Sequence, residues 1–189
     1  MLANYLRPSS SPDSPQSLPH ALTSDELLLL FTALDNLKHR SLLQLTYAAG
    51  LRPNELLELH LCDLDLAARR VRIRATEQRA ERWVEVGPET CQLLSNYRKV
   101  YRIVDRVFTG RGGKPYSTRS VQSVLAKAVR LSGIDPKTTL YSLRNSFGVH
   151  LLQQGVEPAR VRELMGLSSE NMVRKYRRVA AQKEQRRVA

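Results

Sequence analysis

The chain has 189 residues, 42% of them hydrophobic, and its 30 Lys and Arg against 18 Asp and Glu give a formal net charge of +12. This length and hydrophobic fraction suit one globular domain with a single core. The basic excess, in which arginine predominates, indicates a polyanionic partner and fits nucleic acid better than a merely solvated basic surface.

The same composition argues against several classes of protein. Cys62 and Cys91 stand far apart without metal-ligand spacing around either, so neither a zinc site nor a disulfide framework is predicted. The most apolar run, residues 27–31, is too short to cross a bilayer, and residues 1–20 lack the apolar core of a signal peptide. We therefore expect a cytoplasmic, nucleoid-associated protein with no metal and no membrane partner.

The N-terminal part of the chain is predicted to be an arm followed by two helices. Residues 1–22 are rich in Ser and Pro, a composition typical of a flexible arm or linker. Thr23-Ser24-Asp25-Glu26 forms a capping box that begins an apolar helix through about residue 35. A second helix is expected over residues 39–49.

The stretch Ala48-Ala49-Gly50-Leu51-Arg52-Pro53-Asn54-Glu55-Leu56 predicts a corner between two helices. Gly50 suits the position just past a helix end, and Pro53 suits the first turn of the next helix. Arg52 is then held in a tight corner, where its planar fork can bind a phosphate or a carboxylate. A pairing of Arg52 with Glu55 or Glu58 is the alternative interpretation.

A β-hairpin is predicted after this corner. Residues 71–74 alternate apolar and basic side chains, residues 76–80 form a polar turn, and residues 81–86 resume the alternation. Basic residues are expected on the open side and tip of the hairpin, namely Arg72, Arg74, Arg79 and Arg82. These residues favour a hairpin that lies along a DNA backbone, and a solvated sheet face is the alternative.

The rest of the chain is predicted to be helical. Helices are expected over residues 88–105, 118–132, 141–154 and 157–165, and a last basic helix begins after Ser168 and carries Tyr176. The loop at residues 109–114, which ends in Lys114, lacks the glycine spacing of a phosphate-binding P-loop. The pattern predicts an α+β fold that is mainly helical with one small antiparallel sheet, a folded domain over residues 23–180, and a basic tail over residues 181–189.

Three stretches together give the chain a family resemblance. The corner around Arg52, the run Leu140-Tyr141-Ser142-Leu143-Arg144-Asn145-Ser146-Phe147, and the run Leu164-Met165-Gly166-Leu167-Ser168 followed by Tyr176 resemble the catalytic domain of tyrosine recombinases, the phage integrase family. The resemblance covers residues 23–179. Most members also carry an N-terminal helical domain that closes around DNA. Only about 22 residues precede the domain here, so we expect either a fragment of a longer chain or a short member.

The resemblance implies a chemistry for three residues. Arg52 and Arg144 would bind the scissile phosphate, and Tyr176 would attack it to leave a 3′-phosphotyrosyl link and a free 5′-hydroxyl, with no cofactor. The implied partner is double-stranded DNA, with self-assembly on DNA through the C-terminal segment. The residues expected to contact DNA are Arg74, Arg79, Arg82, Lys114, Arg119 and Lys127.

Three positions depart from the family pattern. Glu77 stands where the hairpin usually carries a lysine that protonates the leaving oxygen, and Tyr141 stands where histidine is usual. Leu167 stands where histidine or, just beyond it, an aromatic donor is usual. A positioned general acid contributes roughly 10²–10⁴ in rate. Two hypotheses therefore stay open: a DNA strand-exchange recombinase, or a catalytically impaired member that acts as a DNA-binding accessory or regulatory protein.

Overall fold

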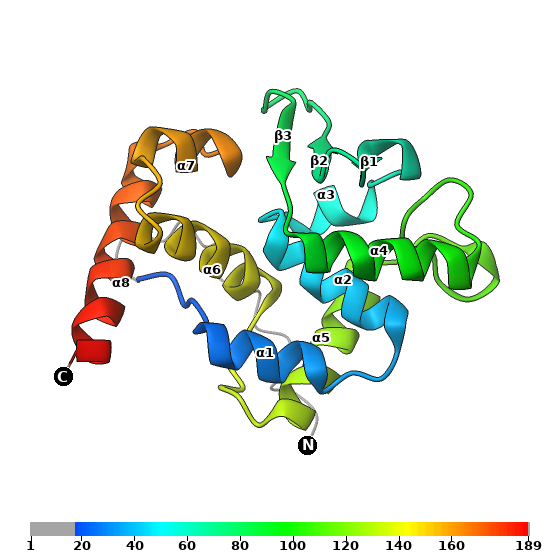
Figure 1. Cartoon of the computed structure of the whole chain (residues 1–189), viewed down its shortest axis with the longest axis horizontal. Coiled ribbons are helices and arrows are strands. Elements are labelled where there is room, and N and C mark those ends of the chain that lie inside the picture. The colour runs from blue at the N-terminus through cyan, green and yellow to red at the C-terminus, as the bar shows by residue number, and fades with distance from the viewer. Residues whose placement is uncertain (1–17, 189) are drawn as a thin grey trace, which may run out of the picture.

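The computed structural model describes residues 18–188, so most of the predicted arm lies outside the described residues. Within them the fold is mainly helical with one small antiparallel sheet, as predicted (Figure 1). The helices are α1 (Ser24–Thr32), α2 (Leu37–Ala48), α3 (Pro53–Leu57), α4 (Pro88–Tyr101), α5 (Thr118–Ser132), α6 (Leu140–Gln153), α7 (Pro158–Leu164) and α8 (Glu170–Val188), with short 3₁₀ turns at Leu61–Asp63 and Arg111–Gly113.

Local capping explains most of the helix boundaries. The capping box of Thr23 and Glu26 begins α1 as predicted, with the Thr23 backbone N–H donating to Glu26 Oε2 at 2.7 Å. Helix α1 ends at Thr32, short of the expected residue 35, because Asn36 already caps α2. Helix α4 ends at Tyr101 and does not reach the expected residue 105. Arg102, which directly follows Tyr101, adopts a left-handed conformation with φ of 48°.

The sheet has three strands in the order β1 (Leu64–Asp65), β2 (Arg70–Ile73) and β3 (Arg82–Glu85), all antiparallel. The hairpin of β2 and β3 was predicted, and the two-residue β1 was not. Val71 pairs with Val84 in register, and both side chains are buried against the helices. Because side chains two residues apart share a face, Arg82 points inward with Val84. The prediction that Arg82 lies on the open side of the hairpin is wrong.

Helix α6 is the centre of the fold. It lies between α2 on one side and α8 on the other, and its residues from Ser142 to His150 are all buried (Figure 1). A helix buried on most of its circumference shows little separation of apolar and polar faces. The polar side chains that α6 carries must therefore be satisfied by hydrogen bonds inside the protein.

The two ends of the described chain pack on this central helix. Ala21 and Leu22, which fall in the predicted arm, are 6% and 0% exposed, so the packed domain begins at about residue 20. At the other end, α8 continues through the predicted basic tail to Val188, and Val179 is buried. Lys183 on α8 donates to the carbonyl oxygen of Ala21 at 2.6 Å. No helix among residues 18–188 is both long and apolar enough to cross a membrane.

Candidate active site

The corner after α2 places Arg52 as the sequence predicts. Gly50 has a φ of 57°, and a Cβ added to it would lie 2.4 Å from Phe147 Cδ1 on α6. Only glycine satisfies both the backbone turn and this close approach. Arg52 follows as the N-terminal cap of α3, with Pro53 at the first helical position. The corner thus directs the Arg52 side chain across the molecule toward the turn after α7.

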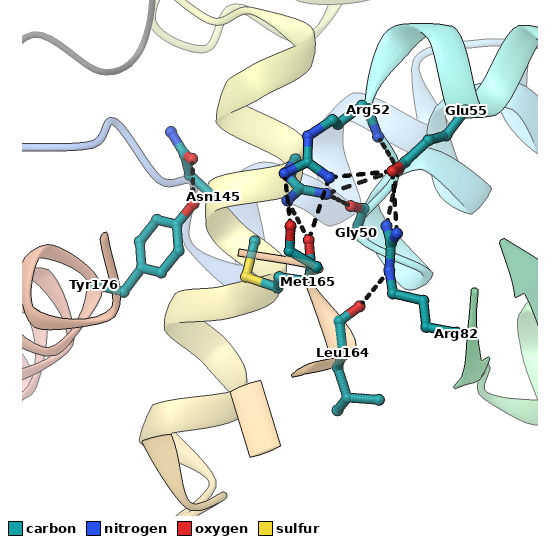
Figure 2. Close-up of polar contacts among 10 residues, drawn as sticks. Gly50, Arg52, Glu55, Arg82, Asn145, Leu164, Met165 and Tyr176 are labelled. Carbon is teal, nitrogen blue, oxygen red and sulfur yellow. Dashed lines mark hydrogen bonds and ion pairs between the residues drawn. The ribbon is translucent and has the colours of Figure 1, made fainter. Parts of the chain in front are cut away.

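Arg52 and Arg144 meet at that turn. Arg52 donates to the carbonyl oxygen of Met165 at 3.4 Å (Figure 2) and to that of Gly166 at 3.0 Å. Arg144, buried on α6, donates to the carbonyl oxygens of Gly50 and Met165. The two guanidinium groups therefore share the Met165 carbonyl, and backbone groups from two separate segments fix their positions.

Glu55 connects the two arginines to a third. Arg82 binds both carboxylate oxygens of Glu55, at 2.8 and 3.1 Å, and donates to the carbonyl oxygen of Leu164 at 2.8 Å. Arg52 Nη1 donates to Glu55 Oε1 at 3.1 Å, and the Arg52 backbone N–H donates to Oε2 at 2.8 Å. Arg144 lies 3.8 Å from the same carboxylate. One carboxylate thus stands among three guanidinium groups, which leaves an excess of two positive charges.

The electrostatics of this cluster keep Glu55 and Arg144 charged at neutral pH. Burial acts to raise the pKa of Glu55, but hydrogen bonds and charge from Arg82, the Arg52 backbone and Arg144 outweigh it and lower the pKa to about 2. Burial, with repulsion from Arg52, lowers the pKa of Arg144 to about 10. The pKa of Arg52 is also lowered, chiefly by burial. The cluster suits an oxyanion, because an oxyanion can accept the hydrogen bonds that the buried guanidinium groups no longer make to water.

A large open cleft of about 1640 Å³ brings the predicted site together. Its walls carry five of the predicted residues: Arg52, Arg74, Arg79, Arg144 and Tyr176. Charge on Arg79 at the hairpin tip also acts on Arg52, so the tip lies near the arginine pair. Arg72 of the hairpin lines the cleft as well, and so do polar residues that were not predicted to contact DNA, among them Gln122, Arg130 and Asn145.

Tyr176 lies at the wall of this cleft with a buried ring. Its residue is 1% exposed, and its hydroxyl donates to Asn145 Oδ1 at 3.0 Å (Figure 2). Gly148 on α6 makes room for it, since an added Cβ would lie 2.4 Å from Met165 Sδ and 3.2 Å from Tyr176 Cδ2. The arginine pair and the phenol are therefore brought to one cleft by the α2–α3 corner, α6 and α8.

Four predicted DNA-contacting residues lie elsewhere. Arg82 is buried beneath the cleft on Glu55. Lys114, Arg119 and Lys127 are exposed and do not line the cleft, and Lys127 acts electrostatically on His39. The positions of Glu55 and Asn145 could have been suspected, because Glu55 occupies the third position of the helix that Arg52 caps, and Asn145 directly follows Arg144.

The three residues for which the sequence predicts a departure from the family pattern line the cleft. Glu77 is exposed at the hairpin tip, Tyr141 is 38% exposed in the first turn of α6, and Leu167 is half-buried after α7. Among residues 18–188 there is no group of three or more His, Cys, Asp or Glu side chains that could hold a metal ion.

Comparison with known proteins adds to this geometry. The family model described as "Phage integrase family" matches residues 20–183. The chain is 34% identical over 173 residues to "Putative integrase/recombinase y4qK" of Sinorhizobium fredii, covering 91% of the chain and 56% of that relative. It is 31% identical over 189 residues to tyrosine recombinase XerD of Xanthomonas campestris pv. campestris, covering 90% and 58%. The chain thus spans little more than half the length of these relatives.

Solved structures share the fold. The crystal structure of XerA recombinase superimposes with a TM-score of 0.79 at 20% identity, over 88% of this chain and 66% of that one. The structure of XerH site-specific recombinase bound to a palindromic difH substrate gives a TM-score of 0.78 at 20% identity, over 94% and 55%. At this identity the likeness concerns the fold alone.

Proposed function

The chain belongs to the phage integrase family of tyrosine recombinases, and from this premise we propose that it cleaves and rejoins double-stranded DNA at specific sites through a covalent bond to Tyr176. The single observation that carries the proposal is the meeting of Arg52, Arg144 and Tyr176 in one cleft. Sequence segments far apart in the chain supply these three side chains, and the fold brings them to one place.

The two arginines hold the phosphate in this reaction. A phosphodiester carries one negative charge on its non-bridging oxygens, and two partly desolvated guanidinium groups stabilise it and the greater charge of the pentacovalent transition state. Arg52 and Arg144 keep N–H groups beyond those bound to carbonyls and Glu55, because each guanidinium has five.

Tyr176 supplies the nucleophile. Its phenol oxygen forms a bond to phosphorus as the bond from phosphorus to the 5′-oxygen breaks, so the phosphate ends on the tyrosine and the 3′ side of the DNA. The phenol proton leaves to water, and the 5′-oxygen takes a proton from water in the open cleft. Attack by the freed 5′-hydroxyl of another strand reverses the step and rejoins the DNA.

DNA occupies the basic cleft in this proposal. Arg74 and Arg79 on the hairpin contact phosphates beside the cleavage point, and the exposed Lys114, Arg119 and Lys127 contact phosphates further along the duplex. Solved relatives support this partner, since XerH is bound to its difH substrate and a lambda integrase dimer is bound to a core site.

A second candidate function rests on the walls of the same cleft. Glu77 repels a phosphate from the place where a general acid would act, and Leu167 offers only apolar contact. In this second candidate function, a protein with these residues binds DNA as an accessory or regulatory factor and does not cleave it. It would show DNA binding whose log–log dependence on salt has a slope of about 0.9 for each phosphate neutralised, without cleavage.

Self-assembly on DNA is part of the proposal, with the C-terminal half of α8 as the contact. A lambda integrase dimer on its core site supports assembly in a related protein. Truncation after Ala180 removes Lys183 and the rest of α8, and it is expected to weaken cooperative binding to a DNA with two sites. Unchanged cooperativity would refute this role.

The test of cleavage is a pool of nicked duplexes with randomised sequence around the nick. A nick next to the cleavage point lets the short released strand diffuse away and traps the protein on the DNA. Wild-type protein is expected to form a covalent adduct, and Tyr176→Phe is expected to form none. Absence of a wild-type adduct, with salt-sensitive binding retained, would favour the accessory function.

A further inference from the structure

The segment His20-Ala21-Leu22, which we name the strap, is bound to α6 and α8 through its backbone. Four hydrogen bonds to its main chain hold it: Leu22 N–H to Ser146 Oγ at 2.7 Å, His150 Nε2 to Leu22 O at 3.0 Å, Asn145 Nδ2 to His20 O at 3.2 Å, and Lys183 Nζ to Ala21 O at 2.6 Å. Because these bonds involve main-chain groups of the strap, they do not depend on its side chains.

Asn145 is hydrogen-bonded both to the strap and to Tyr176. Its amide nitrogen donates to the His20 carbonyl oxygen, and its amide oxygen accepts from the Tyr176 hydroxyl at 3.0 Å. A backbone carbonyl can only accept, so the nitrogen of the amide must face the strap and the oxygen must face the phenol. Asn145 is a buried residue, 7% exposed, that also lines the cleft.

This arrangement fixes the direction of the phenol proton. Since Asn145 Oδ1 can only accept, the Tyr176 O–H points at Asn145, and this contact fixes the place of the phenol oxygen at the wall of the cleft. Without the amide, the hydroxyl loses this partner and the phenol is no longer held in that place. The amide oxygen is too weak a base to take the proton, so it orients the phenol and does not activate it.

We propose that Asn145 is a positioning residue for Tyr176, oriented in turn by the strap. The inference rests on the proposed function, because it assigns a role toward the attacking phenol. It goes beyond the arginine pair and the tyrosine, and it makes the backbone of residues 20–22 part of the support of the nucleophile.

Two variants separate this role from general loosening of the strap. Asn145→Ala removes both contacts of the amide, and Ser146→Ala removes the strap bond at Leu22 without touching Tyr176. At saturating nicked DNA, Asn145→Ala is expected to slow adduct formation about 10-fold with unchanged DNA affinity, because small misplacements of a reacting group are costly. Ser146→Ala leaves the bond from Asn145 to the His20 carbonyl oxygen, which orients the amide, in place and is therefore expected to keep the wild-type rate.

A second readout follows the phenol without any reaction. Nitration by tetranitromethane, mapped by peptide mass spectrometry, should spare the buried Tyr176 in the wild type and modify the exposed Tyr141. Asn145→Ala should raise nitration of Tyr176 several-fold, and Ser146→Ala should not. If Asn145→Ala does not fold, Asn145→Ser takes its place, since serine is too short to span the His20 carbonyl and the phenol.

The results are decisive in either direction. Slower adduct formation together with faster Tyr176 nitration, in the Asn145 variant alone, supports the proposal. Wild-type values in that variant, a change in only one readout, or an equal effect of Ser146→Ala overturn it. If wild-type protein forms no adduct, the proposed function fails and the positioning role fails with it, while nitration still decides whether the Asn145–Tyr176 contact exists.

Discussion

Arg52 and Arg144 donate hydrogen bonds to one carbonyl oxygen, that of Met165. Two like charges at such close range repel, as the pKa of Arg144, lowered to about 10 by burial and by Arg52, shows. The shared carbonyl, the Gly50 carbonyl and Glu55 offset that repulsion. These contacts therefore fix the two guanidinium groups side by side, and they also link separate segments of the fold.

Arg144→Lys is expected to lose both stability and phosphate binding. A lysine ammonium cannot reach the Gly50 and Met165 carbonyls and also offer a fork to a phosphate. Breaking this buried network should lower the free energy of unfolding by about 3 kcal/mol, measured by urea denaturation. Arg130→Lys, at an exposed position in the same cleft, is the control. Equal stability of both variants would contradict the structural role of Arg144.

Glu55→Gln is expected to change how stability depends on pH. The folded pKa of Glu55 is about 2, below its ordinary value of 4.5, so its contribution is present above pH 4.5 and is lost as pH falls toward 2. The shift corresponds to about 3 kcal/mol. The free energies of unfolding of wild type and variant should differ most near pH 7 and converge between pH 4.5 and 2. A difference independent of pH would contradict the account, and Glu81→Gln controls for the loss of one exposed charge.

Gly148→Ala is expected to disturb the site from the back of α6. The added methyl would lie 2.4 Å from Met165 Sδ and 3.2 Å from Tyr176 Cδ2, so one or both must move. Overpacking of this kind costs about 1–3 kcal/mol, which outweighs the better helix propensity of alanine. The melting temperature should fall and adduct formation should slow. Gly87→Ala, with nothing within 4 Å of the added methyl, should do neither.

Glu77→Lys combined with Tyr141→His is expected to raise cleavage. Both positions line the cleft that holds the arginine pair, so the new lysine can protonate the leaving oxygen and the histidine can donate to the phosphate. We expect a gain of roughly 10²-fold in adduct formation at unchanged DNA affinity. No gain over wild type would mean that the scaffold does not place these positions at the scissile phosphate.

Elements with local signals could be predicted from the sequence. The capping box of Thr23, the cap of Ser117 on α5 and the left-handed Gly133 that ends it depend on neighbouring residues, and all three are present. The Arg52 corner was also predictable, because Gly50 and Pro53 punctuate the chain there. The alternative interpretation of Arg52 is confirmed, since it pairs with Glu55; it also lines the cleft, and its binding of a phosphate stays a prediction.

Features that depend on distant partners were missed. Arg82 was expected on the open face, although its spacing of two from Val84 already placed it on the buried side. A charged side chain is rarely buried without partners, and the partners of Arg82, Glu55 and the Leu164 carbonyl oxygen, come from distant parts of the sequence. The burial of Ala21 and Leu22 could not be predicted, because they follow a Ser- and Pro-rich stretch and the backbone of Leu22 is hydrogen-bonded to α6, which is distant in sequence.

The most direct test of the central claim is to map the protein–DNA adduct by mass spectrometry. Two phenols line the cleft with the arginine pair: Tyr176, buried against Asn145, and Tyr141, which is 38% exposed. The account predicts that the adduct formed on a nicked duplex carries its nucleotide on Tyr176 and that Tyr141 stays unmodified. A nucleotide on Tyr141, or an adduct that persists in Tyr176→Phe, would contradict it.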